Sequence, residues 1–145
     1  MELQLLKTLL SSDSYRSNQP KLKRSIFSDD AAELYDLLDM AHAKYEHDLL
    51  LEDMYGLWIA DHPVATNSEK ADFQDLLDDI RNTNAISADV ASDVIAKLWQ
   101  REVGREITNL GINISEGDES AMPLLQNLME RVGESYAVDD FGPPT

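Results

Sequence analysis

The spacing of apolar residues between positions 90 and 114 restricts the fold of this chain more than any other feature. Apolar side chains recur there every three or four residues, which is the period of an amphipathic helix. They are Val90, Val94, Ile95, Leu98, Trp99, Val103, Ile107, Leu110 and Ile114. The pattern predicts one helix of about 27 residues and about 40 Å. Gly104 and Gly111 lie within it, and each weakens it by about 1 kcal/mol relative to alanine.

A second amphipathic helix follows the long one after a short connection at Gly117 and Asp118. Its apolar residues are Leu124, Leu125, Leu128, Met129, Val132 and Tyr136. A short connection favours an antiparallel helical hairpin. Because two such helices present more apolar surface than a small globule can cover, we expect the hairpin to pack against a copy from another subunit.

Shorter helices are predicted in the preceding part of the chain. Leucines at positions 3, 6, 9 and 10 share one face of a first helix, and polar residues up to Pro20 interrupt it. Ile26 and Phe27 are expected to be buried anchors. Ser28 is expected to cap the helix that follows, because serine favours this position and Asp29 then lies in the first turn.

Two further helices are predicted before residue 82. Residues 49–60 form the first, with Leu50, Met54, Leu57 and Trp58 on one face. Thr66 and Glu69 have the spacing of a capping box, which predicts the start of the second. Asp75, Asp78 and Asp79 of that helix are interpreted as its solvated face.

No segment shows the alternating pattern of a β-strand, so the predicted fold class is all-α, a compact globule of short helices followed by an antiparallel helical hairpin. Residues 1–86 are assigned to the helical globular subdomain and residues 87–137 to the hairpin. Residues 138–145 contain a glycine and paired prolines and are expected to begin a linker.

The charge of the chain is strongly negative and unevenly distributed. The formal net charge is −16, and residues 28–80 alone carry fifteen acidic and two basic side chains. Such a surface repels nucleic-acid phosphates, so we expect no direct DNA binding and favour basic partners. No apolar run has the roughly 18 residues of a membrane span. Without cysteines or a secretory signal, the expected location is the cytoplasm.

The sequence lacks the common motifs of catalytic and cofactor sites. It contains no P-loop, dinucleotide-binding, serine hydrolase, zinc protease or EF-hand signature. The histidines are His42, His47 and His62, and His42 with Glu46 is interpreted as part of a solvated helix face. We therefore assign no catalytic, cofactor-binding or metal-binding residue in this chain.

The candidate functional residues are positions for subunit or partner contacts on the hairpin. The apolar candidates for buried or interface positions are Ile95, Trp99, Val103, Leu125 and Met129. Arg101 and Arg105 either form salt bridges along their helix, beside Glu102 and Glu106, or bind a partner. The basic group Lys21, Lys23 and Arg24 has three interpretations: a solvated loop, a contact with the acidic body of another subunit, or a contact with DNA.

The order of these helices resembles the N-terminal domain of DnaB-type replicative DNA helicases. The segments that carry the resemblance are Glu2–Leu10 followed by Tyr15, Ile26–Leu38, Asp48–Met54, and Val90–Glu116 with Lys97 and Arg101. The family's usual opening motif, Pro-x-x-x-Glu-Ala-Glu, is absent, so the resemblance is to a divergent, phage-encoded member rather than to a bacterial housekeeping one.

The resemblance implies an N-terminal oligomerisation and partner-docking domain of a hexameric ATP-dependent replicative helicase. Such a domain forms a dimer or a hexameric collar and docks primase or a helicase loader. ATP and Mg²⁺ would bind only to a motor domain beyond Thr145, and a phage-encoded protein would act in the host cytoplasm. The alternative is a free-standing acidic regulator, or DNA mimic, that occupies a basic cleft of a nucleic-acid enzyme.

Overall fold

Helices account for all the regular structure in the described part of the chain. The computed structural model describes the backbone of residues 1–140 and the side chains of residues 1–133, and no β-strand occurs in residues 1–140. The prediction of an all-α fold is therefore confirmed. The α-helices are α1 (Glu2–Leu9), α2 (Ser12–Asn18), α3 (Asp29–Lys44), α4 (Leu51–Asp61), α5 (Asn67–Asn82), α6 (Ala88–Ser115) and α7 (Ala121–Asp140), and two short 3-10 helices lie at η1 (Gln19–Lys21) and η2 (Arg24–Ile26).

The chain forms two compact units that divide within α6. Unit 1 is Met1–Trp99, and unit 2 is Gln100–Thr145. The hairpin was predicted to begin at residue 87. The contacts of the first part of α6, up to Trp99, instead place it in unit 1. The reason lies in its side chains, since Ala91 and Ile95 are fully buried.

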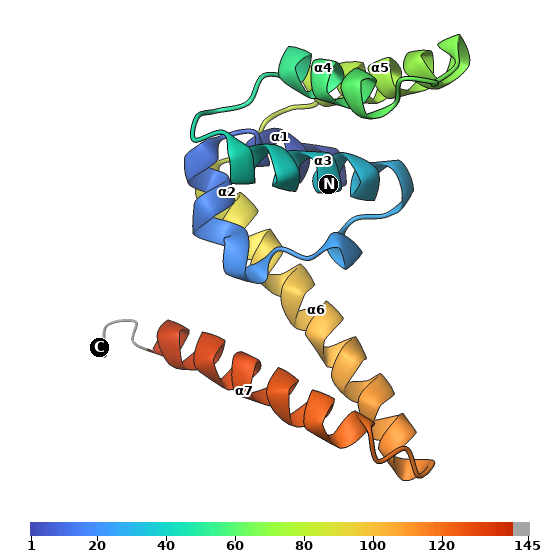
Figure 1. The fold of residues 1–145 in the computed structure, drawn as a ribbon. Helices are drawn as coiled ribbons and strands as arrows, with labels where there is room; N and C mark the ends of the chain where they lie inside the picture. The colour runs from blue at the N-terminus through green and yellow to red at the C-terminus, as the bar shows by residue number, and fades with distance from the viewer. Residues whose placement is uncertain (141–145) are drawn as a thin grey trace. The chain divides into compact units, whose positions relative to one another are not determined.

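Unit 1 is built from two layers of paired helices. The helices α4 and α5 lie side by side in one layer and α1 and α3 in the other, with α3 contacting α4 and α1 contacting α5 (Figure 1). Leucine, methionine and isoleucine side chains from all four helices converge between the layers, namely Leu6, Leu34, Leu38, Met54 and Ile80. All five are at most 2% exposed, so this apolar cluster is the core that stabilises the unit.

The short helix α1 connects the ends of two other helices through charged side chains. The Glu2 carboxylate accepts hydrogen bonds from the backbone N–H and the hydroxyl of Ser28, at 3.0 and 3.1 Å, at the start of α3. The Lys7 ammonium donates to the carbonyls of Arg81 and Thr83, at 3.1 and 2.7 Å, at the end of α5. Both contacts place a charge where the helix dipole favours it.

The prediction that Ser28 caps this helix is confirmed for its position but not for its hydrogen bond. Ser28 is the N-cap residue of α3, but its side chain makes no capping hydrogen bond to that helix. Its hydroxyl donates to the Glu2 carboxylate, which lies at this position because α1 packs against α3. Ile26 and Phe27 are buried as predicted, and Phe27 stacks on Tyr35 with ring centroids 5.0 Å apart.

Two local predictions in unit 1 differ in part from the structure. Polar residues interrupt the first helix after Leu9 as predicted, but the polar segment up to Pro20 also contains α2, where Tyr15 is 3% exposed. Leu50 was expected on the apolar face of its helix and is 61% exposed. The helix was predicted to begin at residue 49 but begins at Leu51, and the Asp53 carboxylate accepts a hydrogen bond from the Leu50 N–H at 2.9 Å.

The capping box at the start of α5 is confirmed. The Thr66 hydroxyl accepts from the Glu69 N–H at 3.2 Å, and the Glu69 carboxylate accepts from the Thr66 N–H at 3.3 Å. These reciprocal bonds satisfy two backbone donors that the first turn of a helix leaves without partners.

The connection in unit 2 also has the predicted location. Gly117 has a φ of +96°, its N–H donates to the Ile114 carbonyl, and the Asp118 N–H donates to the Asn113 carbonyl, both at 3.0 Å. This is a Schellman motif, which ends a helix with a left-handed glycine. The following helix, α7, extends to Asp140, so residues 138–140, which were expected to begin a linker, are helical. The structure does not describe residues 141–145 or the side chain of Tyr136.

Candidate functional site

The predicted apolar interface residues fall into two groups by exposure. Ile95, Trp99 and Val103 on α6 are 0%, 6% and 3% exposed. Other residues of the same chain therefore already cover these three side chains. On α7, Leu125 is half-buried and Met129 is 57% exposed. Among the five candidates, the apolar surface that remains exposed therefore lies on α7.

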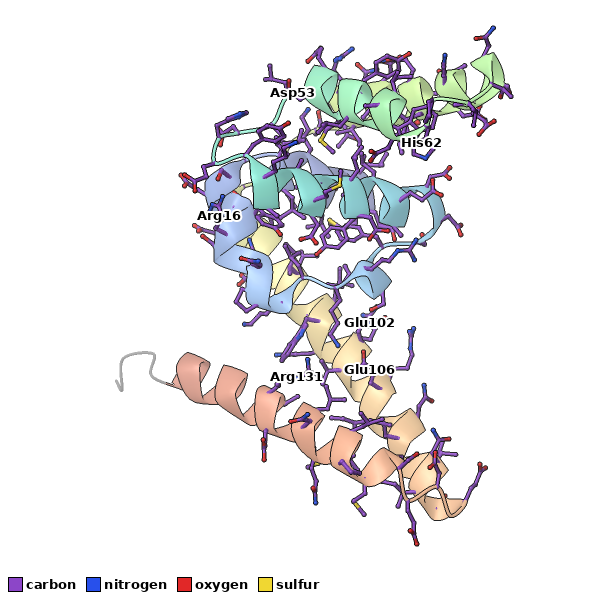
Figure 2. All side chains as sticks on the ribbon, viewed as in Figure 1. Arg16, Asp53, His62, Glu102, Glu106 and Arg131 are labelled. Carbon is purple, nitrogen blue, oxygen red and sulfur yellow. The ribbon has the colours of Figure 1, made fainter. Side chains whose placement is uncertain are left out.

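The two predicted arginines of the hairpin are both exposed. Arg105 forms a salt bridge with Glu102 of the same helix, with 3.3 Å between Nη1 and Oε1, and Figure 2 labels Glu102 on α6. The spacing of three residues is that of ordinary pairing along a helix. Such a pair contributes little at an exposed position. For Arg105, this contact favours salt-bridge formation within α6 over partner binding.

Unit 2 exposes a stripe of large apolar residues on α7. Met122 is 43% exposed, and it lies three residues before Leu125 and seven before Met129, so the three residues share one helix face. The neighbouring Leu124 is 59% exposed. Met122 was not among the predicted interface residues, although the same helical period that selected Leu125 and Met129 would have included it.

Unit 1 contains an acidic groove with an aromatic floor. Its volume is about 380 Å³, and it is formed by the start of α3, by α4 and by α5. Its lining combines six carboxylates with three apolar side chains: Asp30, Glu33, Glu69, Asp72, Asp75, Asp79, Trp58, Phe73 and Leu76. Below we call this site the acidic groove.

The two aromatic residues that line the acidic groove, Trp58 and Phe73, belong to a stack of rings. Trp58 stacks on Phe73 with ring centroids 4.7 Å apart and planes 9° apart. Trp58 also stacks on His62, with ring centroids 4.3 Å apart and planes 16° apart. His62, at the C-terminal end of α4 (Figure 2), is held because its Nδ1 lies 2.8 Å from the Trp58 carbonyl. The stack fixes the orientation of the Trp58 ring.

The interpretation of Asp75, Asp78 and Asp79 as the solvated face of α5 agrees with their exposure, since Asp75 and Asp79 are exposed and the Asp78 side chain is 45% exposed. Asp78 pairs with Arg81 at 3.3 Å and accepts from the Gln74 amide at 3.0 Å. Asp75 and Asp79 instead line the acidic groove. Sequence reasoning missed this groove because the residues of α3 and α4 that complete it are distant in the chain.

The interpretation of His42 as part of a solvated face is wrong. His42 is 1% exposed, its ring stacks on Tyr15 with centroids 4.4 Å apart, and its Nε2 lies 2.7 Å from the Leu9 carbonyl. The Tyr15 hydroxyl donates to the Asp39 carboxylate. This cluster joins α1, α2 and α3, and its burial leaves no access for a substrate, so we interpret it as structural.

Burial also changes the proton affinities in this cluster. It lowers the pKa of His42, because the cationic ring would be desolvated, and the neighbouring Arg16 acts in the same direction. Burial and the hydrogen bond to Asp39 raise the pKa of the Tyr15 hydroxyl. The Nδ1 atom of His42 is buried and has no hydrogen-bond partner among the described residues. His42 is therefore a neutral imidazole at neutral pH.

The described residues contain no group of three or more histidine or carboxylate side chains arranged to hold a metal ion. Likewise, none of the described helices combines the length and the apolar character needed to cross a membrane. Comparisons of the chain with protein-family models, with curated proteins and with solved structures find no match.

Proposed function

We propose that this chain is an assembly and partner-docking domain in which unit 2 pairs with unit 2 of another copy. The observation that carries the proposal is the apolar stripe of Met122, Leu125 and Met129, with the exposed Leu124 beside it. Contiguous exposed apolar surface is typical of protein interaction sites. Its burial contributes about 25 cal/mol per Å².

The test is the oligomeric state of the purified chain. Sedimentation and light scattering should detect an oligomer at high micromolar concentration, and Met122→Gln combined with Met129→Gln should dissociate it. The matched control is Met40→Gln with Val64→Gln, since these residues are 48% and 92% exposed in unit 1. A strictly monomeric chain, or an equal effect of both double variants, contradicts the proposal.

The context that we propose for this assembly is the collar of a hexameric replicative DNA helicase. The support is the resemblance of the helix order, together with an all-α fold that ends in two long helices. In this context the chain docks primase or a loader, and ATP hydrolysis belongs to a separate motor domain. The gene provides a direct test, because a reading frame that continues past Thr145 into a P-loop supports this context and a stop codon contradicts it.

A second candidate, an acidic regulator that occupies the basic cleft of a nucleic-acid enzyme, is favoured by the charge of unit 1. Residues 28–80 carry a net charge of −13. Binding of this kind weakens steeply as salt concentration rises, whereas association through the apolar stripe does not. Sedimentation with the cellular partner at low and high salt therefore separates the two candidates.

A further inference from the structure

The ring of His42 lies between three helices of unit 1. His42 belongs to α3, and its Nε2 is 2.7 Å from the Leu9 carbonyl at the end of α1. The Tyr15 ring of α2 covers one face of it, with ring centroids 4.4 Å apart and planes 17° apart. His42 is 1% exposed, and its Nδ1 is buried without a hydrogen-bond partner among the described residues. A protonated ring would donate from both nitrogens, so the closed arrangement leaves one donor of a cation unsatisfied.

The charged groups around the ring do not make up for this missing acceptor. They are Arg16 on α2 (Figure 2), Asp39 on α3 and Asp48 in the connection between α3 and α4. Arg16 opposes a second positive charge. The two carboxylates favour one, but both already accept hydrogen bonds from α2. Burial outweighs them and lowers the pKa of His42, so the ring takes up a proton only where water reaches Nδ1.

Of the helices around the ring, α2 is the one whose displacement uncovers the least apolar surface. Its sequence is polar apart from Tyr15, and its buried residues are Ser12, Tyr15 and Asn18. The helix α1 instead contributes to the core three leucines that are at most 1% exposed, namely Leu5, Leu6 and Leu9. Because the free-energy cost of opening grows with the apolar area that it exposes, α2 is the element that can move away from His42.

We propose that α2 is an acid-sensitive cover of His42, which moves away from α3 when the histidine takes up a proton and returns when the proton leaves. Displacement breaks the stack of Tyr15 on His42 and the hydrogen bond from the Tyr15 hydroxyl to Asp39, and it brings water to Nδ1. This opening is independent of the pairing of unit 2 in the proposed function, because every residue involved belongs to unit 1.

The direction and size of the effect follow from a single proton. A solvated histidine has a pKa of about 6.5, whereas the enclosed ring binds the proton less tightly. The open fraction is therefore independent of pH well above about 6.5 and rises as the pH falls below this value. If only the open form takes up the proton, this fraction rises about tenfold between about pH 7.5 and about pH 5.5.

The test is hydrogen exchange of the full chain at these two pH values, because the backbone amides of α2 exchange when this helix opens. After correction for the intrinsic exchange rate, the protection of peptic fragments that cover α2 should be about tenfold lower at the lower pH. Fragments that cover α5 should be better protected than α2 at both pH values, since Phe73, Leu77 and Ile80 of that helix are buried.

Three variants assign the effect to the contacts of His42. His42→Gln retains a donor for the Leu9 carbonyl and removes the titrating group, so the pH dependence of α2 should disappear. His47→Gln, the control, alters an exposed histidine and should retain it. Tyr15→Phe retains the ring stack but not the hydrogen bond to Asp39, so the protection of α2 should fall about tenfold at both pH values.

Three results would overturn the proposal. One is equal protection of α2 at both pH values in the unmodified chain. Another is equal protection of α2 and α5 throughout, which would mean that α2 opens only when all of unit 1 unfolds. The third is a pH dependence of α2 that persists in His42→Gln, with the fold of this variant verified by circular dichroism. The first two results need no variant, so they still decide the outcome if His42→Gln does not fold.

Discussion

The burial of His42 predicts that acid destabilises this protein through one specific side chain. Its Nε2 is 2.7 Å from the Leu9 carbonyl and therefore donates to it, which leaves Nδ1 as the atom that would take up a second proton. That atom is buried without a hydrogen-bond partner among the described residues. A cationic His42 would consequently bear an uncompensated charge inside unit 1.

The direction of the effect follows from the lowered pKa of His42. The folded state binds the proton less tightly than the unfolded state, whose histidine has a pKa of about 6.5. Stability is therefore unaffected above this pH and falls as the pH drops below it. Burial outweighs the opposing effects of the Leu9 carbonyl, Asp48 and Asp39, while Arg16 adds to the destabilisation.

The loss of stability on acidification is large enough to measure, because the free energy of unfolding of a protein is typically about 5–15 kcal/mol. If only the unfolded state takes up the proton, the loss is about 1.0 kcal/mol between about pH 6.5 and pH 5.5, and it approaches about 1.4 kcal/mol for each further pH unit. Urea denaturation at several pH values, followed by far-ultraviolet circular dichroism, gives this free energy directly.

A pair of variants isolates His42 from the carboxylates that titrate at lower pH. His42→Gln retains a donor for the Leu9 carbonyl and removes the titrating group, so its stability should be flatter between about pH 6.5 and pH 5.5. His47→Gln alters an exposed histidine and should retain the loss seen in the unmodified protein. If all three proteins lose stability in parallel, or if acidification stabilises the unmodified one, the reasoning about His42 is wrong.

Further predictions concern local structure and the core. Gly117→Ala should destabilise by about 1 kcal/mol because of its positive φ, whereas Gly111→Ala, in open space within α6, should stabilise by up to about 1 kcal/mol. Thr66→Ala should cost about 1 kcal/mol through loss of the α5 cap. Ile95→Ala should cost about 2–5 kcal/mol because its side chain is fully buried. Thermal unfolding of each variant tests these values, and a Gly117→Ala protein as stable as Gly111→Ala would contradict the Schellman assignment.

Features that depend on neighbours along the chain were predictable from the sequence alone. The capping box of Thr66 and Glu69 and the turn at Gly117 each form within about one helical turn, so their residue spacing specifies their geometry. The apolar period likewise predicted α6 and the all-α fold, because a helix repeats every 3.6 residues whatever it packs against.

Tertiary structure alone decided which side chains meet across the chain. His42 was assigned to solvent and is buried, because Leu9 and Tyr15 cover it from helices that lie far from it in sequence. The acidic groove, similarly, requires α3 to lie beside α4 and α5, and the contact between Glu2 and Ser28 at the start of α3 requires α1 to pack against α3. The physical reason is that burial and charge pairing depend on distances in space, and helical periodicity fixes only which face a residue occupies and not what that face contacts.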